Sequence, residues 1–180
     1  MDVDVKHALR RQALQARECG GDAHLLSQNL REVLAAWSGH VLAGYWPMRG
    51  EADPRPAMAT HDGPVCLPVV TAPAQPLIFR RYDGRLEVGR YDTRHPPPDA
   101  PELRPRVLIV PLAGFDRKGA RLGYGGGFYD RTLAQLRAAG PTTAIGLAFA
   151  GQEIRLIPTE PTDQPLDMIV TDREIITPSP

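Results

Sequence analysis

The chain has 180 residues, of which 42% are hydrophobic, so it is long enough to form one domain with a substantial core. Lys plus Arg and Asp plus Glu number 21 each, and this balance gives no support for general nucleic-acid binding, which usually shows as a basic surplus. No apolar run approaches the roughly 18 residues of a membrane span and the start does not resemble a secretion signal, so we expect a soluble, cytoplasmic monomer that binds neither nucleic acid nor membrane.

The first half of the chain carries helical patterns followed by short strands. Apolar residues recur at helical spacing over residues 4–17, and Asp22 is placed to cap a second helix that runs through Trp37. The stretch "PRPAMAT" allows only a short helix. The expected strands cover residues 40–47, 64–70 and 76–82.

The second half begins with a proline-rich, exposed loop at residues 92–105. The most continuous apolar run, residues 106–116, predicts a buried strand, and a glycine-rich stretch and a helix follow it. Tyr129, Leu133 and Leu136 lie on one side of that helix and make it apolar. The remaining expected strands are residues 142–149 and 166–172, the latter being the last.

The cysteines do not indicate a zinc site. Cys19 and Cys66 both lack a CxxC or metal-finger neighbour. We expect Cys19 to be a thiol at a helix end or surface and Cys66 to be buried in a strand.

Strands that alternate with helices predict an α/β fold. We expect a single domain over residues 1–180, with a mainly parallel, open sheet flanked by helices. Open α/β sheets bind ligands beyond the carboxyl ends of their strands. A nucleotide site is therefore expected at the glycine-rich loop between strand and helix.

The glycine-rich loop reads "GYGGGFYD" from Gly123 to Asp130. A helix amino terminus offers free N–H groups and partial positive charge, and glycines let a phosphate approach them. The stretch lacks the Lys-Ser/Thr pair of a P-loop, and Phe128 breaks the dinucleotide fingerprint. The alternative is a left-handed turn with no ligand at all.

Charged neighbours favour the phosphate interpretation. Arg121 precedes the loop, and Asp130 and Arg131 follow it. Arginine binds phosphate through two donors, and a carboxylate in the first helical turn can hold magnesium on that phosphate. Each residue alone is better explained by a surface ion pair or a helix-dipole contact, but together they indicate a nucleoside-triphosphate site.

The segment "VPLAGFDRKGARLGYGGGFYDRTLAQL" resembles the signature of the 5-formyltetrahydrofolate cyclo-ligase (methenyltetrahydrofolate synthetase) family, P-x-x-x-F-D-x-x-G-x-R-L-G-x-G-x-G-[FY]-Y-D. The resemblance extends to "KHALR" near the start, to "YWPMRGEADPRP" and to the closing section "AIGLAFAGQEIRLIPTEPTDQPLDMIVTD". It covers nearly the whole chain.

The resemblance implies an ATP- and Mg²⁺-dependent enzyme that converts 5-formyltetrahydrofolate into 5,10-methenyltetrahydrofolate, releasing ADP and phosphate. The formyl oxygen would attack the γ-phosphate, and the nitrogen at position 10 would then close the ring as phosphate leaves. Such chemistry needs positioning and charge neutralisation rather than a covalent catalyst.

The resemblance also implies roles for single residues. Arg121 and Asp130 would be catalytic, Asp130 and Asp163 would hold magnesium, and Lys6 and Arg10 would reach the nucleotide phosphates. The ATP cradle would be Arg121, Leu122, Gly123, Tyr124, Gly125, Gly126, Gly127, Phe128 and Tyr129. The folate site would include Arg10, Trp46, Glu51, Tyr124, Gly125, Gly126, Gly127 and Phe128.

Other interpretations of these residues stay open. Lys6 and Arg10 also fit a solvated basic helix face, on which we expect Arg17 to face solvent. Trp46 fits core packing as well as contact with the pterin ring. Thr162 stands where the family usually carries a histidine, and residues 92–105 lack the family's Gly-x-x-Glu-Pro element. The alternatives are an ATP-binding relative that acts on another formamide or amide, and a non-catalytic folate-binding protein.

Overall fold

The central feature of the fold is a seven-stranded sheet with the order β11-β10-β9-β6-β1-β2-β3. The computed structural model describes residues 2–179. The sheet strands are β1 (Leu42–Ala43), β2 (Val65–Val69), β3 (Ile78–Arg81), β6 (Val107–Pro111), β9 (Thr143–Leu147), β10 (Met168–Val170) and β11 (Ile175–Ile176). The five strands from β2 to β10 pair in parallel, whereas β3 and β11 are antiparallel edges. The α/β fold with a mainly parallel sheet is therefore confirmed.

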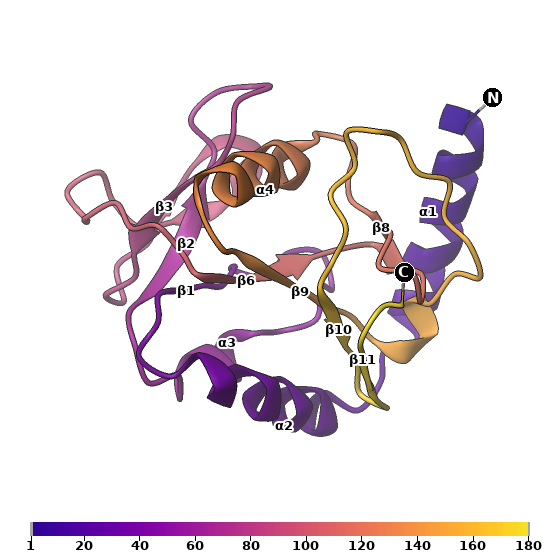
Figure 1. Ribbon diagram of the computed structural model, residues 1–180, viewed down its shortest axis with the longest axis horizontal. Helices are drawn as coiled ribbons and strands as arrows, with labels where there is room; N and C mark the ends of the chain where they lie inside the picture. Colours follow the sequence, from indigo (N-terminus) through magenta and orange to yellow (C-terminus); the bar gives the residue numbers. More distant parts are fainter. Residues whose placement is uncertain (1, 180) are drawn as a thin grey trace.

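Helices cover both faces of this sheet (Figure 1). Helix α4 (Phe128–Ala139) lies on one face, and α2 (Ala23–Leu34) and the short α3 (Arg55–Met58) lie on the other. Helix α1 (Asp2–Glu18) stands apart from both layers, at the end towards which the parallel strands run. Three 3-10 turns complete the helical elements: η1 (Ala35–Trp37), η2 (Arg90–Asp92) and η3 (Ala150–Gln152).

Two small hairpins lie outside the main sheet. Strands β4 (Glu87–Val88) and β5 (Arg94–His95) pair antiparallel, as do β7 (Gly114–Phe115) and β8 (Arg121–Leu122). The second hairpin separates β6 from the glycine-rich loop. The loop therefore follows β8, whereas the sequence predicted it directly beyond the 106–116 strand.

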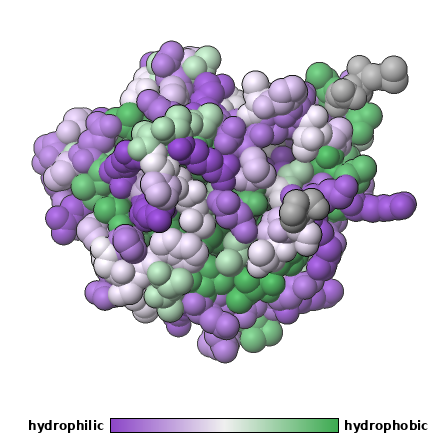
Figure 2. Space-filling view, in the orientation of Figure 1, coloured by the Kyte–Doolittle hydropathy of each residue, from purple (hydrophilic) through white to green (hydrophobic). Residues whose placement is uncertain are grey.

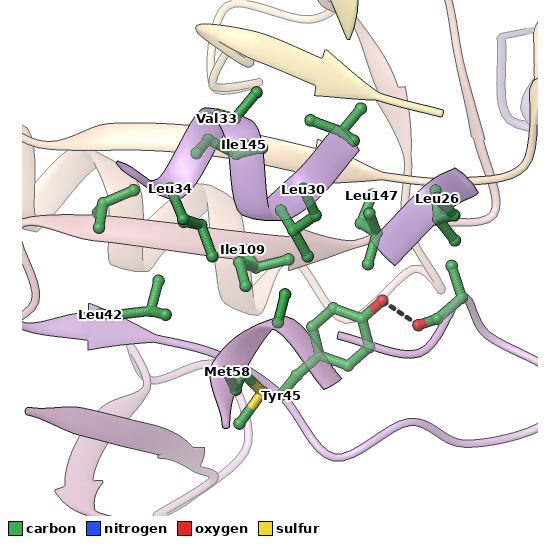
Figure 3. Packing of buried hydrophobic residues seen from close by; sticks show 14 of the residues in the cluster. Leu26, Leu30, Val33, Leu34, Leu42, Tyr45, Met58, Ile109, Ile145 and Leu147 are labelled. Carbon is green, nitrogen blue, oxygen red and sulfur yellow. Dashed lines mark hydrogen bonds between the residues drawn. The ribbon is translucent and has the colours of Figure 1, made fainter. Parts of the chain in front are cut away.

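The core between α2 and the sheet is built from aliphatic side chains. Leu26, Leu30, Val33 and Leu34 of α2 point towards Leu42, Ile109, Ile145 and Leu147 of the strands (Figure 3). The Asp22 side chain caps α2 by accepting from the backbone N–H groups of His24 and Leu25, both at 3.0 Å. The predicted cap is confirmed, although the α-helix ends at Leu34 and continues to Trp37 only as η1.

Some predicted elements differ from the structure in extent. The 40–47 strand reduces to Leu42–Ala43, because the chain then leaves the sheet to line a cavity described below. Residues 92–105 were expected to be a wholly exposed loop, but they contain β5, and Pro96, Pro97 and Ala100 are buried. The prediction missed β11, which is only two residues long and follows β10 after a tight turn.

The two cysteines are placed as expected. Cys19 is exposed just beyond α1, and Cys66 is buried in β2. Burial raises the pKa of the Cys66 thiol to about 12.

Hydrophilic side chains cover much of the face seen in Figure 2, and a hydrophobic area is visible beside the start of α1. Val3 and Val5 of this helix are 64% and 47% exposed. Within residues 2–179, none of the helices is both long and apolar enough to cross a bilayer.

Replacing Leu30 by alanine tests the packing of α2. Leu30 is fully buried, so we expect Leu30→Ala to lower the free energy of unfolding by about 2–5 kcal/mol. Leu25 on the same helix is 43% exposed, and Leu25→Ala is the matched control with an expected change within about 0.5 kcal/mol. Urea denaturation of both variants measures the difference, and equal losses would contradict this packing.

Candidate active site

A cavity of about 1010 Å³ opens at the end of the sheet towards which the parallel strands run. Segments that are far apart in the sequence line it: α1, the chain after β1, the glycine-rich loop, the start of α4 and the loop before β10. Every residue that the sequence assigned to the site lines this cavity, namely Lys6, Arg10, Trp46, Glu51, residues 121–130 and Asp163. The fold therefore brings all the predicted site residues to one place.

The glycine-rich loop leaves the amino terminus of α4 open. Gly125 and Gly127 have φ angles of 94° and 66°, which side chains rarely adopt, so glycine is required at both positions. Gly127 is the N-cap residue of α4, and no side chain caps the helix there. The first N–H groups of α4 are thus free to meet a ligand that carries negative charge.

Arg121 and Asp130 form an ion pair at the floor of the loop. The Arg121 Nη2 donates to Asp130 Oδ1 over 2.7 Å, and the Arg121 side chain is only 7% exposed. The same carboxylate oxygen accepts from the backbone N–H of Gln164 at 2.9 Å. Asp130 thereby ties α4 to β8 and to the loop before β10.

Several buried donors beside this pair lack a partner. Within residues 2–179, Arg121 Nε, Arg131 Nε and the Tyr129 hydroxyl are buried without any hydrogen bond, and all three residues line the cavity. A buried polar group without a partner costs about 1–3 kcal/mol. Unpartnered cationic donors next to an open helix amino terminus indicate a site for an anion such as a phosphate chain.

Helix α1 supplies the facing cations. The Lys6 Nζ lies 3.1 Å from Asp163 Oδ2 and 3.4 Å from Glu160 Oε1, both in the loop before β10. The Arg10 Nε donates to the Gly123 carbonyl at 2.6 Å. The helix therefore connects the glycine-rich loop on one side to the loop before β10 on the other.

Glu51 and Trp46 line another part of the cavity. Glu51 Oε2 accepts from the Met48 N–H at 2.9 Å, and burial raises the pKa of this carboxyl group. Trp46 packs edge-on against Tyr82, with ring centroids 6.0 Å apart, and the Arg55 guanidinium lies 4.8 Å from the Trp46 ring. Trp46 also packs against the main core, so core packing is confirmed, and its contact with a pterin ring stays a prediction.

The expectation that Arg17 faces solvent is wrong. Arg17 is 7% exposed, and its Nη1 donates to the Tyr124 hydroxyl at 2.5 Å while its Nη2 donates to the Arg49 carbonyl at 2.6 Å. The seven-residue spacing from Arg10 places both side chains on the same face of α1. Arg10 lines the cavity, whereas Arg17 lies behind its wall and bonds to two residues that line it, Tyr124 and Arg49. The spacing was visible in the sequence, but the position of the helix was not.

The two carboxylates predicted to hold magnesium are engaged in ion pairs, Asp130 with Arg121 and Asp163 with Lys6. Among residues 2–179, no group of three or more His, Cys, Asp or Glu side chains could hold a metal ion. Protein sites bind Mg²⁺ through one or two carboxylates together with phosphate oxygens and water. These residues therefore fit a magnesium ion only when a nucleotide supplies further oxygen ligands.

The regions that depart from the family signature also border the cavity. Thr162 lines it, and so do Tyr91, Thr93 and Arg94 from the β4–β5 hairpin. The Tyr91 ring lies 6.0 Å from the Phe128 ring of α4. No pattern in the sequence indicates that Tyr91 reaches the site. The pairing of β4 with β5 brings it there.

The fold and the cavity define an α/β protein with a cavity at a strand-to-helix loop, lined by buried donors that lack a partner. A family model described as "5-formyltetrahydrofolate cyclo-ligase family" matches residues 4–172. The chain belongs to the 5-formyltetrahydrofolate cyclo-ligase family.

Named relatives agree over nearly the whole chain. The 5-formyltetrahydrofolate cyclo-ligase of Escherichia coli (strain K12) is 34% identical, with 92% of this chain and 96% of the relative covered. The enzyme of the same name from Mycolicibacterium smegmatis is 31% identical, with 96% of both chains covered.

Solved structures agree with the fold. The 5,10-methenyltetrahydrofolate synthetase of Aquifex aeolicus superposes with a TM-score of 0.75 at 24% identity, covering 96% of this chain and 92% of that one. The synthetase of Mycoplasma pneumoniae gives a TM-score of 0.68 at 25% identity, covering 96% and 99%.

Because of these unpartnered donors, we expect the cavity to bind an inorganic polyphosphate, which carries no nucleoside or folate group. Inorganic tripolyphosphate should bind the wild-type protein, and Arg121→Gln should weaken binding about tenfold or more, because one charge-assisted contact is lost. Isothermal titration calorimetry measures both affinities. Arg117→Gln is the control, since Arg117 is an exposed arginine paired with Glu153 and Glu174 and does not line the cavity. Equal affinity for wild-type protein and Arg121→Gln would contradict the anion site.

Proposed function

We propose that the protein is an ATP- and Mg²⁺-dependent 5-formyltetrahydrofolate cyclo-ligase. The observation that supports it most is one cavity in which unpartnered cationic donors and a half-buried carboxylate, Glu51, line the same space. A phosphate chain needs the first set of groups, and the amino-pyrimidine edge of a pterin needs the second. The name of the family and of its members, 5-formyltetrahydrofolate cyclo-ligase, supports the folate half of this proposal.

The nucleotide half of the site consists of the loop from Gly123 to Gly127 and the cations around it. The open amino terminus of α4 and Arg121 would bind the phosphates, with Lys6 and Arg10 reaching them from α1. Lys6 would exchange its contact with Asp163 for a phosphate oxygen. Such an exchange replaces one charge partner with another, so the lysine is never buried without one.

Glu51 would recognise the pterin. An ionised carboxylate accepts two parallel hydrogen bonds, and the amino-pyrimidine edge of the pterin donates them. Trp46 and Tyr124 line the cavity beside Glu51 and would flank the ring. The Met48 N–H holds one Glu51 oxygen in place before any ligand arrives.

The reaction would join the two halves. The formyl oxygen of the substrate attacks the γ-phosphate, and ADP leaves with the electron pair of the broken bond. The nitrogen at position 10 would then attack the activated carbon and give up its proton, and phosphate would leave with that proton and the former formyl oxygen to give the methenyl product. The protein would hold the reactants in line and neutralise their charge, chiefly through Arg121 and the helix amino terminus.

Magnesium would supply further charge neutralisation on the phosphates when it is bound. Asp130 Oδ1 accepts from Arg121 and from Gln164, while Asp163 Oδ2 accepts from Lys6 and from the Glu160 N–H. The bonds from Arg121, Gln164 and Glu160, which remain when Lys6 turns to a phosphate oxygen, would orient the carboxylates that hold the ion.

A folate-dependent release of ADP tests the function against its alternatives. Wild-type protein with MgATP should release ADP only when 5-formyltetrahydrofolate is present. ADP release with another formamide but not with this folate would favour a relative of different specificity. Folate binding without any ADP release would favour a protein that only sequesters the folate.

The substitution Asp130→Asn tests the magnesium role. Asparagine keeps one oxygen for Arg121 and Gln164 but loses the charge, so the protein should remain folded while turnover falls by at least about a hundredfold. Turnover at saturating MgATP and thermal unfolding are measured together. Wild-type turnover at ordinary magnesium concentration would remove Asp130 from the reaction.

The substitution Glu51→Gln tests the folate role. Glutamine keeps the shape but turns one acceptor into a donor, which would face the donor edge of the pterin. We expect folate binding to weaken by about 2–4 kcal/mol, as for a buried unpaired group beside a charge. Affinity for the nucleotide alone should not change. A folate affinity equal to that of wild type would place Glu51 outside the folate site.

A further inference from the structure

Arg17 bonds to two parts of the cavity wall, the glycine-rich loop and the turn that precedes Glu51. Its Nη1 donates to the hydroxyl of Tyr124 in the glycine-rich loop, and its Nη2 donates to the carbonyl of Arg49. The guanidinium carbon also lies 5.9 Å from the centre of the Tyr124 ring. Because the Arg17 side chain is buried, water does not compete freely for either hydrogen bond.

The turn that Arg17 holds is the one that presents Glu51. Arg49 and Gly50 follow one another with φ angles of 52° and 78°, and the left-handed conformation is uncommon for a residue with a side chain. The Glu51 N–H donates to the Met48 carbonyl at 2.9 Å, which closes the turn. The hydrogen bond that Arg17 donates to the Arg49 carbonyl therefore helps to keep this left-handed backbone conformation in place.

We propose that Arg17 is a positioning residue that couples the nucleotide half of the site to the folate half. It holds Tyr124 and the Arg49–Glu51 turn in one arrangement, so that a nucleotide on the glycine-rich loop and a pterin on Glu51 strengthen each other's binding. The inference rests on the proposed function, since that function supplies the two ligands. It assigns Arg17 no contact with the reacting atoms.

Arginine is the residue type that this role requires. Its planar guanidinium donates in two fixed directions at once, here towards a hydroxyl and towards a carbonyl. A lysine would keep the charge but present a single point donor. Arg17→Lys should therefore retain one contact at most and recover only part of the coupling.

The charge of Arg17 also acts on Glu51. Burial raises the pKa of the Glu51 carboxyl group, whereas the Tyr124 hydroxyl and the Arg17 and Arg49 guanidinium groups oppose that rise. Tyr45 from the segment after β1 and Tyr129 from α4 also face this carboxylate. Removing the Arg17 charge should raise the pKa of Glu51 further, so that the carboxylate forms only at higher pH.

A titration of the ligand-free protein tests the geometry without any assumption about the ligands. Carbon-13 NMR of the Glu51 carboxyl group should show a higher pKa in Arg17→Gln than in wild type. Arg11→Gln is the matched control, because Arg11 is exposed on the same helix and carries the same charge. An unchanged Glu51 pKa in Arg17→Gln, or an equal rise in both variants, would overturn the assignment of Arg17.

Calorimetry tests the coupling itself. The dissociation constant of 5-formyltetrahydrofolate is measured with and without MgADP for wild type, Arg17→Gln, Tyr124→Phe and the double variant. Wild type should bind the folate more tightly when the nucleotide is present, and the variants should lose most of this gain. With the nucleotide present, Arg17→Gln should bind the folate about tenfold more weakly than wild type. The double variant should lose less than the sum of the two single losses, because both substitutions break the hydrogen bond between Arg17 and Tyr124.

The outcomes separate this inference from the proposed function. No folate binding by wild type would overturn the proposed function, and the coupling with it. Folate binding that is equal in wild type and Arg17→Gln, or additive losses in the double variant, would overturn the coupling alone. Circular dichroism melting of each variant confirms that the comparison is between folded proteins.

Discussion

The ion pair between Arg121 and Asp130 holds together the elements that form the site. It links β8 to the first turn of α4, and Asp130 extends the link to the loop before β10 through the Gln164 N–H. A largely buried pair is stable only while both charges keep their partners, and removing one partner typically costs about 3–5 kcal/mol. The glycine-rich loop between these residues is thereby fixed at both ends, although its glycines contribute no side-chain contacts of their own.

Helix α1 completes the cavity from outside the sheet. Ala13 packs against Leu122, Ile154 and Ile157, which places the helix across the end of the sheet where the parallel strands finish. From its polar face, Lys6 contacts the loop before β10 and Arg10 contacts the glycine-rich loop. Arg17 contacts both the glycine-rich loop and the turn at Arg49. The site therefore depends on one docked helix as much as on the sheet, and this arrangement accounts for how cations near the start of the chain meet a loop more than a hundred residues later.

The sequence predicted the parts of this account that depend on local pattern. The apolar run of β6, the cap at Asp22 and the residues of the glycine-rich loop all follow from periodicity or from residue type. The family resemblance identified residues that line the cavity, and this identification did not require knowledge of the fold. Pattern alone failed where tertiary contact decides the outcome. Arg17 was expected to face solvent, Tyr91 was given no role, and the β7–β8 hairpin interrupted the expected path from strand to glycines.

The central claim is that one cavity binds a nucleoside triphosphate and a formylated folate and joins their chemistry. The measurement that tests it most directly is the absorbance of the methenyl product after wild-type protein is mixed with ATP, Mg²⁺ and 5-formyltetrahydrofolate. The account predicts that the methenyl band appears, requires all three additions and is lost in Asp130→Asn. No methenyl band from folded wild-type protein, under conditions in which both ligands bind, would contradict it.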